Sequence, residues 1–431
     1  MQHGSCECSK TELDVQAVPP TMTAMEEGEW IEHYPIAALN NSAPIEFIIP
    51  SQTEKWTDLN QSFLYLKVKV TKADGTNLED DTSTSVVNNL LHSLFTSIDL
   101  YLNNKLVTSN SDTYPYRAYI EHLLSYNTSS KDTQLRAMSL WAEDTAGHMQ
   151  ANTHDGANVG LKTRRSRIHE SRVCELAGRL HLDIALQEKY LPNGIEMRLR
   201  LNKTSNAFHM FGQAEGKLHI LQASMNVRTV QLLPVVANDL NREIAMHNMK
   251  IPIRRVEVKT FTIPVGLRSK IEDHLFQGQL PKRLIIGMVR NSHMNGEFTS
   301  NPFDFQHFGL TKLDVAVNGT SIHNKPFEPD FENGNYLQSY MSLYQATGAL
   351  GQNRSMGISL EAYGAGYTLW GYDLTADQGC EEGQLHPIRT GNIRLELQFG
   401  ANLANVINVI VYAEYDNQIT INSLREVITD Y

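Results

Sequence analysis

Two stretches that lie far apart in the chain decide the fold: SIDLYLNNKLV (97–107) and KLDVAVNGTSI (312–322). Each has the alternating apolar residues of a β-strand, followed by an Asn-Asn or Asn-Gly pair and a second short strand. Asn-Gly is the strongest short hairpin signal, because a type I′ turn needs positive φ at both central residues. The sequence therefore predicts two equivalent β-hairpins, with turns at Asn103-Asn104 and Asn318-Gly319.

Further pairs of similar stretches follow in the same order. GIEMRLRLN (194–202) resembles NIRLELQFG (392–400), and HILQASMNVRTV (219–230) resembles IVYAEYDNQITI (410–421). Each hairpin is also followed by a tyrosine-rich stretch with helical spacing, where the tyrosines are expected to serve packing rather than a cofactor. Matches that keep their order predict an internal duplication of a β domain of roughly 190 residues.

The rest of the chain reads as strands separated by turn residues. An antiparallel domain of this size with inserted helices fits a jelly roll, which folds two Greek keys into a sandwich. An immunoglobulin-type sandwich takes about 100 residues and shows a Cys, Trp, Cys spacing that is missing here. We therefore expect an all-β double jelly roll: two tandem eight-stranded antiparallel β-sandwiches with short inserted helices. The expected divisions are an N-terminal arm (1–40), a first jelly roll (41–232), a linker (233–250), a second jelly roll (251–424) and a C-terminal tail (425–431).

Composition and charge exclude several classes of function. The chain has 431 residues and a net charge of −11, so its average surface potential repels nucleic acid and anionic membranes. No basic segment leads into an apolar run near the start, and no apolar run is long enough to span a bilayer. We expect a soluble protein made in the cytosol, with no dedicated DNA-binding role and no membrane insertion.

The residues that could carry chemistry form no known motif. Cys6 and Cys8 form one C-x-C, and Cys174 and Cys380 are isolated, so neither a disulfide framework nor a four-ligand zinc site follows. A cupin-type metal enzyme would need H-x-H, a following Glu and a later His. Instead His148, His154 and His169 fall in a loop-like region and the other histidines are scattered singly. No catalytic, cofactor-binding or metal-binding residue is predicted, and no cofactor and no enzymatic activity are expected.

The most basic stretch is KTRRSR (162–167). We interpret it as an exposed loop. The alternative is a contact with packaged DNA or with an acidic neighbouring subunit.

Longer strings in this sequence resemble one protein family. They are AGRLHLDIALQEKYLPNGIEMRLRL (177–201), FQGQLPKRLIIGMV (276–289), NGEFTSNPFDFQHF (295–308), GYTLWGYDLTAD (366–377) and YAEYDNQITINSLREVITDY (412–431). They are similar to the major capsid proteins of Polinton or Maverick elements and of the related adintoviruses, which also appear in animal genomes. The likeness runs from about Glu12 to the C-terminus.

The resemblance implies a structural protein of the virion capsid, made in the host cytosol. It implies homotrimers of pseudo-hexagonal outline that tile an icosahedral shell, contacts between neighbouring trimers and a single jelly-roll penton partner. It also implies packaged double-stranded DNA without sequence-specific binding. The alternative from another class is a carbohydrate- or receptor-binding β-sandwich, which would need exposed aromatics and polar loops gathered at one end. An enzyme of cupin type ranks last.

Overall fold

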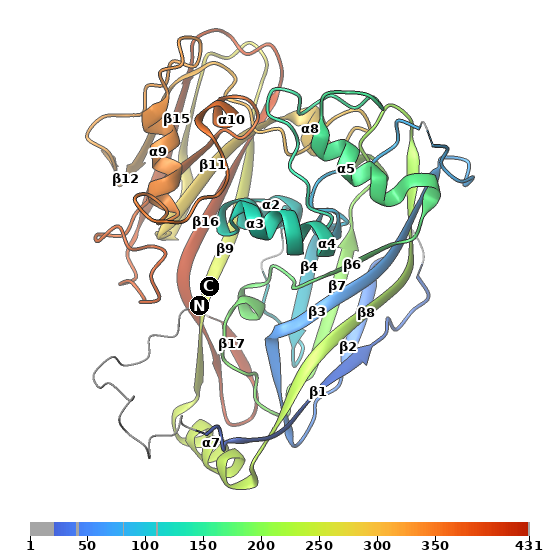
Figure 1. The fold of residues 1–431 in the computed structure, drawn as a ribbon. Coiled ribbons are helices and arrows are strands. Elements are labelled where there is room, and N and C mark those ends of the chain that lie inside the picture. Colours follow the sequence, from blue (N-terminus) through green and yellow to red (C-terminus); the bar gives the residue numbers. More distant parts are fainter. Residues whose placement is uncertain (1–20, 40–42, 81, 109–110, 430–431) are drawn as a thin grey trace, which may run out of the picture.

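The computed structural model describes residues 21–39, 43–80, 82–108 and 111–429. Strands dominate it and the helices are short (Figure 1). The strands of the first half are β1 (Met25–His33), β2 (Ile45–Ile49), β3 (Lys55–Lys72), β4 (Phe95–Leu102), β5 (Lys105–Leu106), β6 (Cys174–Gly178), β7 (Met197–Lys203) and β8 (Gly216–Leu232). Those of the second half are β9 (Met249–Ile263), β10 (Ser269–Gln279), β11 (Arg283–Arg290), β12 (Leu310–Val317), β13 (Thr320–Ser321), β14 (Leu369–Asp373), β15 (Thr390–Phe399), β16 (Ile407–Ile421) and β17 (Val427–Thr429).

The helical segments lie in the connections between strands. The first half has α1 (Leu90–Ser93), α2 (Tyr114–Ser125), α3 (Thr128–Ser130), η1 (Lys131–Leu135), α4 (Arg136–Met138), α5 (Val159–Ile168), η2 (His169–Ser171), η3 (Asp183–Leu186) and α6 (Asn206–His209). Helix α7 (Pro234–His247) connects the halves, and the second half has α8 (Asn291–Asn295), α9 (Leu337–Ala346) and α10 (Leu360–Gly364). No helix of the described residues has the length and apolar character needed to cross a membrane.

The two halves have the same strand order. In the first half the sheets are β1-β8-β3-β6 and β2-β7-β4-β5. In the second half they are β9-β16-β11-β14 and β10-β15-β12-β13, so adding eight to each strand number converts one half into the other. All of these pairings are antiparallel. Successive strands alternate between sheets except at the hairpins β4-β5 and β12-β13, which is the jelly-roll arrangement. The double jelly roll predicted from the sequence is confirmed, and the three matched pairs of stretches are β4 with β12, β7 with β15 and β8 with β16.

Both predicted hairpin turns are confirmed. Asn318 and Gly319 have φ of 51° and 83°, and Val317 pairs with Thr320. Asn103 and Asn104 have φ of 45° and 66° in the equivalent turn between β4 and β5. Positive φ at both central residues is the type I′ geometry.

Apolar side chains fill each sandwich and also the space between them. One core lies inside the first jelly roll and another inside the second. A third core joins the two and is rich in aromatic rings. In it, Tyr119 of α2 stacks on Phe303 of the second half, with ring centroids 4.2 Å apart. Because this interface is apolar and closely packed, the two sandwiches form one body rather than two domains on a hinge.

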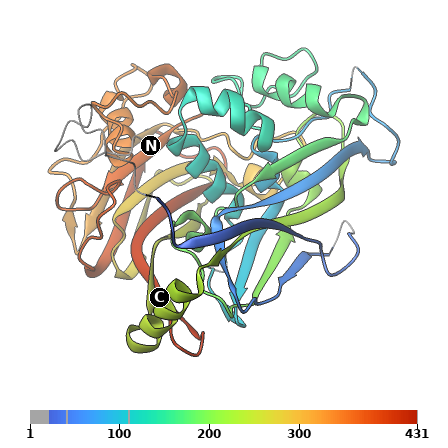
Figure 2. The same cartoon turned by 60° about the horizontal axis from the view of Figure 1, so that its bottom comes forward.

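The structure adds secondary-structure elements to the predicted ends and linker. Residues 25–33 of the predicted arm are strand β1, which pairs along β8, whereas residues 1–20 lie outside the described part. An edge strand that is exposed at most positions needs no apolar alternation, so the sequence pattern did not reveal it. The predicted tail contains β17, which pairs with the end of β16. The predicted linker is mostly helix α7, which lies beside the hairpin before β17 (Figure 2), where Arg425 donates to Asn241 over 2.6 Å.

Candidate functional site

A cleft of about 680 Å³ lies between the two jelly rolls. One wall comes from α2 and the chain around η3, and the other from β9, β11, β16 and the loop at 381–385. Its charged lining includes Arg117, Glu121, Asp183, Arg254, Lys282, Arg283, Glu381, Glu414 and Asp416. The described structure pairs these four cations with these five carboxylates, so their charges nearly cancel and give the cleft no strong preference for an anion or a cation.

On the second jelly roll, the ion pairs centre on Glu414, whose side chain is 2% exposed. Its carboxylate contacts the guanidinium of Arg283 and lies 3.3 Å from Nζ of Lys282. Burial alone would raise the pKa of Glu414, but these two cations and Arg254 outweigh it and lower the pKa below its ordinary value. Lys282 also contacts Asp416 over 2.8 Å, so one buried lysine holds two carboxylates.

On the first jelly roll, Arg117 of α2 is the equivalent centre. Its guanidinium lies 2.9 Å from Glu121 and 2.7 Å from Asp183. Burial acts to raise the pKa of Glu121, but the charges of Arg117 and His181 prevail and hold it at about 2. Asp183 also accepts the backbone N–H of Val256 on β9 over 3.2 Å, which links the network to the second half. Since these carboxylates are ion-paired, the network stabilises the contact between the two jelly rolls and supplies no free general base.

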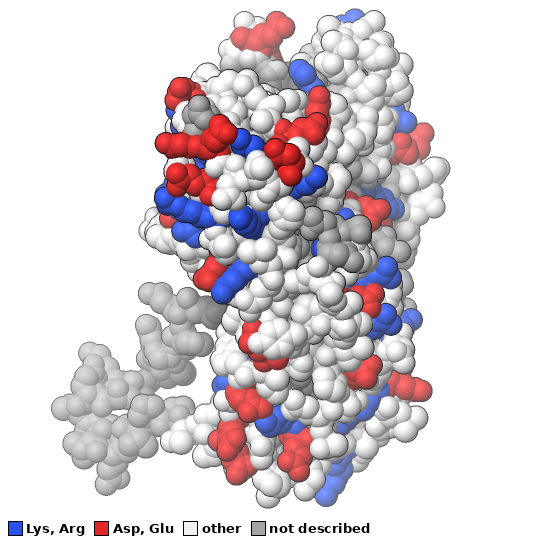
Figure 3. Space-filling view, turned by 90° about the vertical axis from the view of Figure 1, so that its right-hand side faces the viewer, with Lys and Arg blue, Asp and Glu red and all other residues white. Residues whose placement is uncertain are grey.

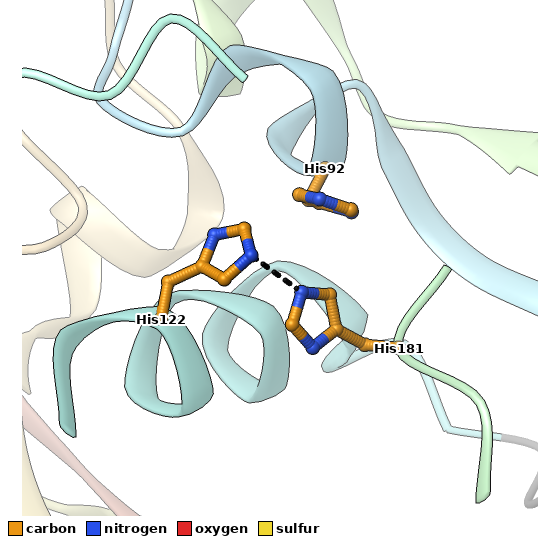
Figure 4. Close-up of side chains that lie close together, drawn as sticks. All are labelled: His92, His122 and His181. Carbon is orange, nitrogen blue, oxygen red and sulfur yellow. Dashed lines mark hydrogen bonds between the residues drawn. The ribbon is translucent and has the colours of Figure 1, made fainter. Parts of the chain in front are cut away.

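Three histidines meet behind the first-half side of the cleft (Figure 4). His92 comes from α1, His122 from α2 and His181 from the chain between β6 and η3. One ring nitrogen of each lies within 4.8 Å of those of the other two, and all three side chains are buried. Burial, assisted by the charge of His181, lowers the pKa of His92 and of His122 well below the ordinary value, so these two rings are neutral at pH 7.

Solved viral capsid structures share this fold. No protein-family model matches the chain. The Sputnik virophage structure covers 97% of this chain and 91% of its own, with a TM-score of 0.63 at 13% identity. The PBCV-1 virus capsid covers 97% and 99%, with a TM-score of 0.57 at 12% identity.

The mavirus major capsid protein covers 100% of this chain and 95% of its own, with a TM-score of 0.56 at 11% identity. The chain has the double jelly-roll fold of these capsid proteins. Among curated proteins, the "Uncharacterized protein F54H12.2" of Caenorhabditis elegans is 24% identical over 430 residues, which are 96% of this chain and 99% of that protein.

The basic stretch at 162–167 is not an exposed loop, so that prediction is wrong. It lies in helix α5, and the side chain of Arg164 is fully buried. Arg164 donates to Asp144 over 2.6 Å and to the carbonyl of Val86 over 2.9 Å. Arg165 is also buried, whereas Lys162 and Arg167 are exposed, so only part of the stretch is free to meet DNA or another subunit.

The histidines singled out in the sequence do not come together. His148 is exposed, and His154 and His169 are half-buried, with His169 beside Asp80. The three that do meet are 30 and 59 residues apart in sequence, a spacing that matches no metal-binding motif. Sequence reasoning missed this cluster because only the packing of α1 and α2 against the η3 segment creates it.

Two of the cysteines and two of the tyrosines singled out in the sequence are buried. Cys174 and Cys380 are buried free thiols, and Cys6 and Cys8 lie outside the described residues. Tyr116 and Tyr119, after the first hairpin, are buried in the core between the sandwiches, as expected for packing residues. The face in Figure 3 carries acidic and basic side chains interspersed, without one large basic patch.

Proposed function

We propose that this protein is a major capsid protein, a structural subunit without enzymatic activity. Its proposed assembly is a pseudo-hexameric homotrimer that tiles an icosahedral shell around double-stranded DNA. The observation that carries the proposal is the duplicated strand order, β1 to β8 repeated as β9 to β16. The capsid proteins that share the fold over nearly the full chain support it.

The duplication explains the proposed number of subunits. A site with hexagonal surroundings needs six similar walls, and a fused pair of jelly rolls supplies six walls from three chains around a closed threefold axis. The third apolar core supports this, because it fixes the two sandwiches relative to each other and each chain then contributes a rigid pair of walls.

The full-length similarity to a nematode protein supports a place among Polinton, Maverick and adintovirus-like elements, since the family resembled by the sequence also occurs in animal genomes. A virion location, a single jelly-roll penton partner and DNA held without sequence-specific contacts belong to the same proposal. The net charge of −11 is consistent with a shell that encloses DNA without a dedicated binding site. We also propose that the chain divides into its two jelly rolls at the linker 233–250, where α7 lies.

Light scattering after size exclusion tests the trimer. We expect a particle of about three times the 48.6 kDa chain mass. An obligate interface of this kind buries on the order of 2,000–5,000 Å² and is more apolar than the remaining surface. The trimer should therefore persist in moderate salt, because apolar burial rather than charge attraction stabilises it.

Electron microscopy of the same fractions should show particles with a pseudo-hexagonal outline, and closed shells under assembly conditions. A folded protein that remains a monomer at micromolar concentration would contradict the proposal. Binding of that monomer to glycans would then favour the carbohydrate-binding alternative.

A further inference from the structure

The histidine cluster described above has a hydrogen-bond pattern that the capsid role does not explain. Each ring uses its Nδ1 for a different neighbour. Nδ1 of His122 lies 3.0 Å from Oδ1 of Asn89, and Nδ1 of His92 lies 2.9 Å from the hydroxyl of Tyr114. Nδ1 of His181 contacts the carboxylate of Glu121. A partner on the outer nitrogen orients each imidazole, as in metal sites where the other nitrogen is the ligand.

When both rings are neutral, the positions of the hydrogens leave the lone pairs of His122 and His181 facing each other. The carboxylate of Glu121 and the amide oxygen of Asn89 are acceptors, so Nδ1 of His181 and of His122 each carry the hydrogen. A neutral imidazole with hydrogen on Nδ1 has a bare lone pair on Nε2. The two Nε2 atoms are nevertheless only 3.0 Å apart (Figure 4). Two lone pairs at this distance repel each other unless a cation or an additional proton lies beside them. Without a metal, the proton that gives His181 the charge described above fills this place, so a bound cation and a protonated His181 are alternatives.

His92 supplies a third nitrogen without a partner. Its side chain is 1% exposed, and its Nε2 has no hydrogen-bond partner among the described residues. Its ring centroid is 5.1 Å from that of His122 and 4.6 Å from that of His181. A buried, unpartnered imidazole nitrogen is unfavourable unless something satisfies it.

We propose that His92, His122 and His181 bind one divalent transition-metal ion, with Zn²⁺ as the best fit. Imidazole nitrogens suit zinc and its neighbours cobalt, nickel and copper, whereas calcium and magnesium require oxygen ligands. Zn–N bonds of about 2.0–2.1 Å in tetrahedral geometry place the nitrogens about 3.3 Å apart. The Nε2 atoms of His122 and His181 already approach this separation. Metal binding would therefore require movement mainly of the His92 ring towards the other two.

The ion would connect three separate elements of the first jelly roll: α1, α2 and the chain before η3. The ligand His181 and its partner Glu121 also line the cleft between the two jelly rolls. Metal binding would therefore stabilise the part of the first jelly roll that forms its side of the junction. This site does not depend on the proposed capsid function, and its test reports on neither trimer nor shell.

The wild-type full-length chain provides the first test. Elemental analysis after purification in zinc-containing buffer should find about one zinc per chain. The Tm should rise with zinc concentration after chelation, because an ion that binds only the folded chain stabilises it. Substitution by Co²⁺ should give the visible absorption bands of nitrogen-ligated cobalt. Substoichiometric zinc together with an unchanged Tm would overturn the proposal, and the additional proton would then be the group between the two Nε2 atoms.

Two variants locate the ion. His92→Gln and His122→Gln remove a ligand but keep a polar side chain, and each should lose the zinc and the zinc-dependent rise in Tm. His209→Gln is the matched control, because His209 is equally buried but bonds to Thr204 and Asn206 outside the cluster. It should keep both. Zinc retained by His122→Gln at the level of His209→Gln would contradict the assignment. If the ligand variants do not fold, the titration and cobalt spectrum of the wild-type chain still decide.

Discussion

The hydroxyl of Tyr412 on β16 lies 3.3 Å from Oε1 of Glu121 on α2, so a single phenol connects the two jelly rolls inside their shared core. The same hydroxyl lies 3.5 Å from Oε2 of Glu414, and it has one hydrogen to share between the two carboxylates. The ion-pair centres of the two halves, around Arg117 and around Glu414, therefore meet at Tyr412.

Tyr412→Phe should destabilise the folded chain by about 1–2 kcal/mol, because the buried carboxylate of Glu414 and the partly buried carboxylate of Glu121 lose a hydrogen-bond donor. The matched control is Tyr363→Phe. The hydroxyl of Tyr363 is equally buried, but it has no hydrogen-bond partner among the described residues, so its removal should be neutral or slightly stabilising. Urea unfolding of both variants measures the difference. Equal effects of the two substitutions would show that the Tyr412 bond contributes nothing.

Gly319→Val should destabilise by roughly 1–2 kcal/mol. No atom lies within 4 Å of the added Cβ, so the cost comes from backbone strain at φ of 83° and not from a clash. Gly383→Val is the control, because that glycine also has open space around it but lacks positive φ. Thermal melts should show a lower Tm for Gly319→Val alone. A melt identical to wild type would contradict the role of the type I′ turn.

Arg164→Met should cost about 3–5 kcal/mol, because it leaves the carboxylate of Asp144 buried without its cation. Arg167→Met changes the same residue type in the same helix at an exposed position and should alter stability by no more than about 0.5 kcal/mol. Chemical denaturation checks both. If the two substitutions had similar small effects, the basic stretch would be a surface feature, as the sequence first indicated.

Stability should fall in acid partly through His209. Burial lowers its pKa to about 4, whereas histidine in an unfolded chain titrates near 6.5. As pH falls between these values, the unfolded chain binds a proton that the folded chain does not, so the folded state loses up to about 3 kcal/mol. The contribution is complete above about pH 6.5.

His209→Gln removes this titration, so its urea midpoint should fall less than that of wild type between neutral pH and about pH 4. Other buried histidines act in the same direction and leave a residual slope. A variant whose midpoint falls as far as that of wild type would show that His209 is not the titrating group.

Much of the fold could be predicted because its signals are local. The alternation of Leu313 and Val315, or of Leu395 and Leu397, follows directly from a strand with one face in the core. The turns at Asn103 and Asn318 depend on residues that tolerate positive φ. The duplication is readable because both halves repeat these local signals in the same order.

The site could not be predicted in this way, because charge and ligand positions depend on partners that are distant in sequence. Nothing local distinguishes the buried Arg164 from the exposed Arg167, and it is Asp144, 20 residues away, that makes burial of Arg164 possible. Strand β1 was missed for a similar reason, since an edge strand takes its hydrogen bonds from β8 and not from its own pattern.

The sequence by itself thus determined the two jelly rolls, their turns and their repetition, because side-chain periodicity and backbone preference act between neighbouring residues. Only the tertiary structure decided how the halves join and which polar groups are buried. It brings Tyr412 to Glu121 across 291 positions and gathers His92, His122 and His181 at one point. A buried charge or lone pair is stable only beside its partner, and those partners are set by packing in three dimensions.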